Sequence, residues 1–178
     1  FKYMKNKDNN KKENNTMNTM IDKQENMNFG PTQADITHAI KQADLKYAEL
    51  TEKLKTLPVK GKGTLQMVEE RAEAAVDKHF LVRGYYPMTQ TLKRGPIDRM
   101  YYKVKDGKPI FYNIDVKGIN PNANYKPAFK PRVDKKFLVR DKAVNRIVAI
   151  EYNGTIKFIP GYLDNYKNLK DKYIDIID

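Results

Sequence analysis

The fold is decided by the stretch Pro96-Ile97-Asp98-Arg99-Met100-Tyr101-Tyr102-Lys103-Val104-Lys105-Asp106-Gly107-Lys108-Pro109-Ile110-Phe111-Tyr112-Asn113-Ile114-Asp115-Val116-Lys117. Its two halves, 97–104 and 110–117, are rich in the β-branched and aromatic residues that favour strands. Between them lies Asp106-Gly107, which favours a two-residue turn because both of its positions tolerate positive φ. The stretch therefore predicts an antiparallel β-hairpin.

A two-residue turn fixes which residues face each other across this hairpin. Lys105 faces Lys108, so the numbers of each facing pair add to 213, and Asp98 faces Asp115. Facing residues have Cβ atoms about 4.5–5.5 Å apart. Lys117 shares the face of Asp115, because side chains alternate along a strand. Two facing carboxylates destabilise a sheet, so we expect a compensating divalent cation, and Mg²⁺ is commonly held by one or two carboxylates with waters and substrate phosphates.

The second strand of the hairpin has two chemically different faces. The apolar face consists of Ile110, Tyr112, Ile114 and Val116, and the other of Phe111, Asn113, Asp115 and Lys117. The first can pack on a helix, while the polar end of the second opens into a cleft. The string Asp-x-Lys occurs at Asp44, Asp106, Asp115 and Asp134. Only at Asp115 does it end an apolar strand opposite a second carboxylate. The structural alternative is an ordinary exposed ion pair, which contributes little stability.

Two helices are predicted before the hairpin. Thr32 can cap the first helix, and apolar residues then recur at alternating spacings of four and three from Ile36 to Leu57. This spacing is a heptad seam over 31–58, which either pairs with a second copy of the chain or packs on its own domain. The second helix is predicted over 64–79, with a buried stripe formed by Leu65, Val68, Ala72, Ala75 and Val76. By its spacing, Glu69 falls inside this stripe, whereas Glu70 points elsewhere.

Further strands and helices are predicted around the hairpin. Residues 80–86 predict a strand, and 146–152 with 155–159 predict a second hairpin around Asn153-Gly154. Residues 118–136 are rich in Pro, Asn and basic residues and predict a loop. Short helices are predicted over about 133–143 and from Pro160 onward.

The positive charge lies mainly on the part of the chain that is predicted to fold. The 178 residues carry +12; residues 1–30 contribute +2 and 31–58 are neutral, which leaves +10 on 59–178. The Asn- and Lys-rich segment 1–30 predicts a flexible arm, followed by the heptad helix 31–58 and an α/β domain over 59–178. A basic folded face favours polyanionic partners such as nucleic acid. A generally Lys- and Asn-rich composition is the alternative origin of that charge.

Several classes of protein are disfavoured by what the sequence lacks. Cysteine is absent, which excludes disulfides, thiolate zinc sites and a cysteine nucleophile. The two histidines, His38 and His79, lie far apart, which disfavours a histidine metal site and a Ser-His-Asp triad. No run of about 18 apolar residues occurs, so we expect no membrane span. An Asn- and Lys-rich chain without cysteine is typical of a low-GC bacterium or its phage, so we expect a cytoplasmic location in a bacterial or phage-infected cell.

Three groups of residues together resemble a known family. They are Gly63-Thr64-Leu65 leading into Glu69, the segments 96–102 and 112–117 with their Asp and Asp-x-Lys, and the segment 146–152 followed by Phe158-Ile159-Pro160. This order resembles the PD-(D/E)XK nuclease superfamily and, within it, the RecU-type Holliday junction resolvases. The resemblance covers about residues 61–165. It implies an α/β fold with a restriction-endonuclease-like core, a mixed central sheet flanked by helices, here with an N-terminal helical extension.

The resemblance also implies an activity and a set of site residues. The activity is Mg²⁺-dependent hydrolysis of phosphodiester bonds in DNA, at branched DNA such as a Holliday junction, by a homodimer. Asp98 and Asp115 would hold Mg²⁺, for which Mn²⁺ can substitute, with the Val116 carbonyl as a further ligand. Lys117 would orient the attacking water or stabilise developing negative charge. Glu69, or alternatively Glu70, would complete the metal shell or bind a second metal ion.

Basic residues around the site predict contacts with the DNA backbone. Lys93 and Arg94 precede the first strand of the hairpin, and further cations interleaved with aromatic residues lie in the long loop, at Lys126, Lys130 and Arg132. Such residues fix register on phosphates without reading sequence. A solvated linker is the alternative interpretation of the loop.

Two functions of another class remain open from the sequence. A non-catalytic basic protein that binds nucleic acid would bind with a steep salt dependence and without regard to Mg²⁺. A phage structural or assembly protein would use the heptad helix to oligomerise, and removal of 1–58 would then abolish its role.

Overall fold

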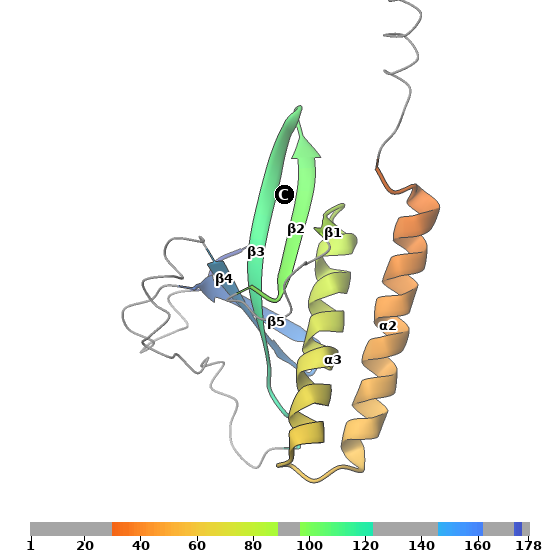
Figure 1. Cartoon of the computed structure of the whole chain (residues 1–178), viewed down its shortest axis with the longest axis vertical. Helices are drawn as coiled ribbons and strands as arrows, with labels where there is room; N and C mark the ends of the chain where they lie inside the picture. Colours follow the sequence, from red (N-terminus) through yellow and green to blue (C-terminus); the bar gives the residue numbers. More distant parts are fainter. Residues whose placement is uncertain (1–29, 89–96, 123–145, 162–172, 176–178) are drawn as a thin grey trace, which may run out of the picture. The chain divides into compact units, whose positions relative to one another are not determined.

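The computed structural model describes residues 30–88, 97–122, 146–161 and 173–175 (Figure 1). The chain divides into two compact units, Phe1–Ala34 and Asp35–Asp178. The second unit has an α/β fold, as predicted, and it contains the sheet together with the first described helix from Asp35 onward. The predicted short helix at 133–143 and most of the predicted helix after Pro160 lie outside the described residues.

The described elements are two helices and a five-stranded mixed sheet. They are α2 (Gln33–Lys55), α3 (Lys62–Leu81), β1 (Tyr86–Met88), β2 (Arg99–Lys105), β3 (Lys108–Gly118), β4 (Arg146–Tyr152) and β5 (Thr155–Pro160). The strand order is β1-β2-β3-β4-β5. All neighbouring strands are antiparallel except β3 and β4, which are parallel.

Both predicted hairpins are confirmed, and their turns explain why. Asp106 and Gly107 have φ of 52° and 72°, and Asn153 and Gly154 have φ of 48° and 80°. Asp, Asn and Gly are the residues that reach this left-handed region at the least cost, so the two dipeptides set both reversals. The loop length in turn fixes the register of each pair of strands.

Helix α3 covers one face of the sheet and builds the main core. Figure 1 shows α3 running along β2 and β3, with α2 beside it. The core joins small and aromatic residues of the helix to the inward residues of the strands, which include Ala72, Val76, Phe80, Tyr101, Ile114 and Val116. A separate cluster on the opposite face consists of Val148, Ile150 and Ile159. The predicted apolar face of the β3 strand is therefore the face that meets a helix.

Gly118 lets α3 approach β3 closely. A Cβ at this position would lie 2.5 Å from the Val68 carbonyl oxygen, a distance that side-chain atoms do not adopt. Only glycine fits here, because any side chain would push the strand away from the helix backbone. This close contact fixes the position of β3 along α3 at the residue that follows Lys117.

Two predictions about α3 and the strand after it are wrong. Residues 80 and 81 continue the helix instead of starting a strand, and only Tyr86–Met88 forms β1. Phe80 follows Val76 by four residues, so the helix buries its ring completely and stacks it on Tyr101 at 4.1 Å between centroids. The predicted buried residue Leu65 is 59% exposed, and the charged Arg71 is fully buried instead.

The predicted heptad helix is present as α2, and part of its seam packs within its own unit. Ile36, Leu50 and Leu54 are buried. The Tyr47 hydroxyl donates to Glu151 Oε1 at 3.0 Å, and Asn122 Nδ2 donates to the Leu54 carbonyl at 2.7 Å. The alternative in which this seam pairs with a second copy stays a prediction. Within the part of the chain that the structure describes, no helix is long and apolar enough to cross a bilayer.

Candidate metal and nucleic-acid site

The register of the β2–β3 hairpin is the one predicted from its turn. The paired residues run from Lys105↔Lys108 to Arg99↔Ile114, and the numbers of each pair add to 213. Asp98 directly precedes β2, and its backbone N–H donates to the Ile114 carbonyl at 2.9 Å. The hairpin therefore brings Asp98 to the part of β3 that carries Asp115.

The Asp98 carboxylate turns back onto β3. Its Oδ2 accepts the backbone N–H of Val116 at 2.8 Å, at the residue next to Asp115. Because the N–H and C=O of one strand residue point to the same edge, the Val116 carbonyl also points toward the Asp98 edge of β3. The two aspartates and this carbonyl thus gather on one side of the end of β3.

Asp115 is held by two cations at once. Its Oδ1 accepts Lys117 Nζ at 2.6 Å, and its Oδ2 accepts Arg146 Nη1 at 2.9 Å. The Asp115 side chain is 8% exposed, that of Arg146 is 12% exposed and that of Lys117 is 41% exposed. Solvent and ligands therefore reach this carboxylate mainly past the lysine.

The environment of Asp115 disfavours its negative charge. Burial raises the pKa of Asp115 to about 6. The positive charges of Lys117 and, to a smaller extent, Arg146 lower the pKa of Asp115 and so oppose this rise. The hydrogen bond with Asp98 raises the pKa further. A carboxylate that is buried beside a second carboxylate is typical of metal and acid–base sites.

The helical glutamates predicted for the site are placed elsewhere. Glu69 is exposed on α3, and Glu70 is partly exposed and accepts Gln66 Nε2 at 2.9 Å. Among the contacts of the described residues, none joins Glu69 or Glu70 to Asp98 or Asp115. The expectation that Glu69 lies in the buried stripe is wrong. The buried side of α3 includes Arg71 and Ala74, and Glu69 lies outside it.

A different glutamate of α3 lies nearer to the hairpin. Glu73, one turn after Glu69, accepts Arg99 Nη2 at 2.7 Å, and Arg99 Nε also donates to Asp77 at 3.2 Å. Burial raises the pKa of Glu73, Arg99 opposes the rise, and the charge of Asp98 adds to it. Arg99 Nη1 also donates to the Asp98 carbonyl at 3.1 Å, so this ion-pair group anchors the backbone of Asp98.

Two residues of the site escaped the sequence analysis. Arg146 was predicted only as the first residue of a strand, and no sequence signal shows that this strand lies parallel beside β3, with Asn113 opposite Arg146. Glu73 shares the helix face of Glu69 by its spacing of four, which is the signal that could have found it. Residues Lys93, Arg94, Lys126, Lys130 and Arg132, predicted to contact DNA, lie outside the described residues.

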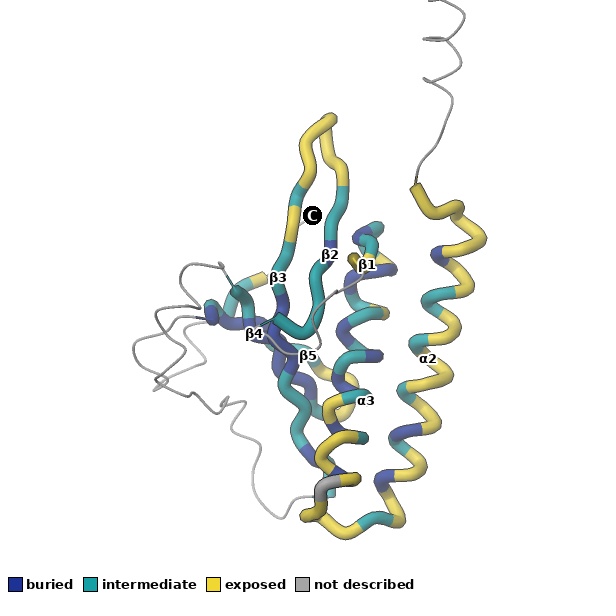
Figure 2. The backbone as a smooth tube through the Cα atoms, viewed as in Figure 1, coloured by how far each residue is buried: buried dark blue, intermediate teal, exposed yellow. Residues whose placement is uncertain are grey.

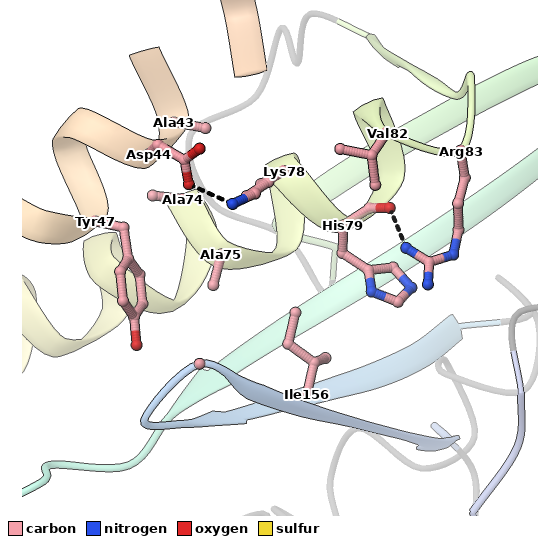
Figure 3. A pocket seen from close by; sticks show the side chains of 11 residues that line it. Ala43, Asp44, Tyr47, Ala74, Ala75, Lys78, His79, Val82, Arg83 and Ile156 are labelled. Carbon is pink, nitrogen blue, oxygen red and sulfur yellow. Dashed lines mark hydrogen bonds and ion pairs between the residues drawn. The ribbon is translucent and has the colours of Figure 1, made fainter. Parts of the chain in front are cut away.

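The described part of the chain also has a cavity away from the aspartates. It lies between α2, α3 and the β4–β5 hairpin (Figure 3). Its volume is about 300 Å³. Asp44 and Lys78 form an ion pair of 2.6 Å at its wall, and Ala74, Ala75 and Ile156 line it. It lies on the α3 side of the sheet, so it does not include Asp98 or Asp115.

Comparisons with protein-family models, with curated proteins and with solved structures gave no match for this chain.

Proposed function

We propose that this chain is a Mg²⁺-dependent endonuclease that hydrolyses phosphodiester bonds in DNA, with a core of the PD-(D/E)XK type. The observation that carries the proposal is the gathering of Asp98, Asp115 and Lys117 at one end of the β2–β3 hairpin. The order α3, β1, β2, β3 also agrees with the helix, strand and hairpin that the sequence resemblance implies.

The donor atoms of this site suit a hard divalent cation. Asp98 and Asp115 contribute carboxylate oxygens and Val116 a carbonyl oxygen, and Mg²⁺ prefers oxygen ligands. Within the described residues, no group of three or more His, Cys, Asp or Glu side chains could hold a metal ion. Two carboxylates suffice for Mg²⁺, because waters and substrate phosphates complete its coordination.

Each residue then has a defined task. Asp98 and Asp115 would hold the cation, and the backbone N–H of Val116 keeps the Asp98 carboxylate oriented. The bound cation would lower the pKa of a water and neutralise charge that develops on the phosphate. The Lys117 side chain is 41% exposed, against 12% for Arg146, so Lys117 can turn from the Asp115 carboxylate to the attacking water or to the phosphate.

The tip of the β2–β3 hairpin favours a DNA substrate with unpaired or unstacked bases. Figure 2 shows this tip as exposed, extending past the rest of the sheet. Val104 and Phe111 are 61% and 55% exposed. By the alternation of side chains they share the face of Asp115, and Lys105 and Lys108 flank the turn. Exposed apolar groups beside cations stack on or wedge between bases, which is easiest where a duplex branches.

The test is cleavage of a labelled four-way junction and of a matched linear duplex, each with Mg²⁺, with Mn²⁺ and with chelator. We expect cleavage with either metal ion, a preference for the junction, and no cleavage with chelator. Sedimentation of the same protein checks the predicted homodimer. Glu69→Gln and Glu73→Gln, assayed side by side, show which glutamate of α3 supports the reaction.

A non-catalytic nucleic-acid-binding protein is the second candidate. It is favoured by the two cations that already neutralise Asp115, since such a cluster can be purely structural. Junction binding that is steeply salt-dependent, unaffected by Mg²⁺ and never followed by cleavage would establish it and overturn the nuclease.

A further inference from the structure

Arg146 is built into the site from a neighbouring strand. It is the first residue of β4, and its guanidinium donates to Asp115 Oδ2 at 2.9 Å and to the Gly161 carbonyl at 3.3 Å. The Gly161 N–H donates to the Arg146 carbonyl at 2.8 Å. A Cβ on Gly161 would lie 2.6 Å from that carbonyl oxygen, so the glycine lets the chain pass this close to Arg146.

Among the residues that the structure describes, the charges in contact with Asp115 balance without a metal ion. Asp98 and Asp115 carry two negative charges, and Lys117 and Arg146 carry two positive charges. Each cation occupies a different oxygen of Asp115. A divalent cation that binds Asp115 must take at least one of these oxygens, and it leaves the site with a surplus of two positive charges. That surplus favours an incoming anion.

We propose that Arg146 is a phosphate-binding residue of this site that is held on Asp115 until a divalent cation displaces it, an inference that rests on the proposed function. The guanidinium then binds a phosphodiester oxygen of the DNA that meets the cation. Arginine suits this role, because its planar fork donates two parallel hydrogen bonds to a phosphate and stays charged throughout. The consequence is that the cation and the DNA bind cooperatively through one side chain.

This consequence separates Arg146 from a residue that only stabilises the fold. Arg146→Gln weakens DNA binding only under conditions in which Asp115 no longer holds the guanidinium. A divalent cation produces that condition in the wild-type chain. Asp115→Ala produces it without any metal ion, because the carboxylate is gone. Substitution of a residue that only stabilises the fold would change DNA affinity by the same factor with the cation, without it and in the Asp115→Ala background.

The experiment is a double-mutant cycle in DNA affinity, measured by fluorescence anisotropy on a labelled junction at fixed salt. The proteins are wild type, Arg146→Gln, Asp115→Ala and the double variant, each with Ca²⁺ and with chelator, Ca²⁺ serving as a divalent cation of low activity. We expect Arg146→Gln to weaken binding about tenfold with Ca²⁺ and less than twofold with chelator. In the Asp115→Ala background, we expect about tenfold weakening with chelator as well.

Metal affinity gives a second measurement that needs no DNA. Calorimetric titration with Ca²⁺ should show tighter binding to Arg146→Gln than to wild type, because a competing cation is removed. Lys60→Gln is the matched control, since it removes one charge from an exposed residue of the turn between α2 and α3. We expect its effect on DNA affinity to be equal with Ca²⁺ and with chelator. Thermal melting of every variant confirms that it folds.

The outcomes separate the inference from the proposed function. Cleavage of the junction by wild type, together with an equal effect of Arg146→Gln in all four conditions, would overturn the inference and leave the nuclease standing. A wild-type chain that binds neither Ca²⁺ nor DNA would overturn both. Weaker DNA binding of Arg146→Gln only with Ca²⁺ or in the Asp115→Ala background supports the inference. If Arg146→Lys restores only part of the Ca²⁺-dependent DNA affinity, the planar guanidinium is needed for full binding.

Discussion

Two buried carboxylates on neighbouring strands, Glu151 of β4 and Asp115 of β3, are held in different ways. Glu151 Oε2 accepts Arg71 Nη2 at 2.8 Å, and both side chains are fully buried. Its Oε1 accepts the hydroxyl of Tyr47 and the N–H of Gly154. Asp115 instead pairs with Lys117, whose side chain is 41% exposed. The first carboxylate has fixed partners shut off from water, whereas the second has a partner that can leave.

The difference shows how one sheet can use buried charge for two purposes. Glu151 lies on the face of α3, where its partners come from α2, α3 and the adjacent turn and tie these elements together. Asp115 lies on the other face, at the open end of the β2–β3 hairpin, where its partly exposed partner Lys117 can be replaced by a ligand. We expect substitution at the first cluster to reduce stability, and substitution at the second to reduce activity while sparing or improving stability.

The largest expected effect is the loss of cleavage in Asp115→Ala. We expect Mg²⁺-dependent cleavage to fall by about a hundredfold or more, with DNA affinity equal to or above that of wild type, because a negative charge leaves the site. Single-turnover cleavage and anisotropy measure the two quantities. Asp106→Asn is the control, since it changes the Asp-x-Lys string of the turn and keeps a residue that tolerates φ of 52°. A cleavage rate near that of wild type in Asp115→Ala would exclude the proposed site.

The next effect concerns stability at the other cluster. Arg71→Met leaves the Glu151 carboxylate buried without its guanidinium, which costs about 3–5 kcal/mol of unfolding free energy. Urea unfolding followed by circular dichroism measures the change. The double variant Arg71→Met with Glu151→Gln should recover part of the loss, because it removes the unpaired charge. A loss below about 1 kcal/mol would show that this pair is not the tie between the elements.

Asp115→Asn should increase the free energy of unfolding, whereas Arg71→Met decreases it. The pKa of Asp115 rises from 3.8 to about 6 on folding, so the folded state prefers the protonated acid. The resulting penalty appears as pH rises from about 4 to about 6, is complete above that range, and amounts to about 3 kcal/mol. We expect Asp115→Asn to melt several degrees higher than wild type at pH 8 and near wild type at pH 4. Mg²⁺ should raise the melting temperature of wild type and not that of the variant.

The smallest effect tests the close crossing of α3 and β3. Gly118→Ala places a Cβ 2.5 Å from the Val68 carbonyl oxygen and should cost about 1–2 kcal/mol of unfolding free energy. Gly63→Ala is the matched control, because a Cβ there meets nothing within 4 Å and should stabilise α3 by about 0.5–1 kcal/mol. Equal melting temperatures for the two variants would show that the crossing is looser than described.

The sequence was most informative where local chemistry decides the structure. Asp106-Gly107 and Asn153-Gly154 demand the turns that form, and the first of them sets the register that brings Asp98 to Asp115. It was least informative where partners lie far apart in the chain. The burial of Arg71, the extension of α3 through Phe80 and the contact of Arg146 with Asp115 all depend on tertiary packing, which residue pattern alone does not encode.

The hydrogen bond from Tyr47 to Glu151 spans 104 positions of the chain, and it has a consequence for biosynthesis. Helix α2 is translated early, and its anchor on β4 does not exist until that many further residues have been added, which takes roughly 5–20 s on a ribosome. During that interval α2 can pack on α3, but Tyr47 and the buried Arg71 lack the Glu151 carboxylate that they share in the folded chain. Until β4 and β5 emerge, the sheet that α3 covers is incomplete, and the apolar surface that the nascent chain exposes favours aggregation.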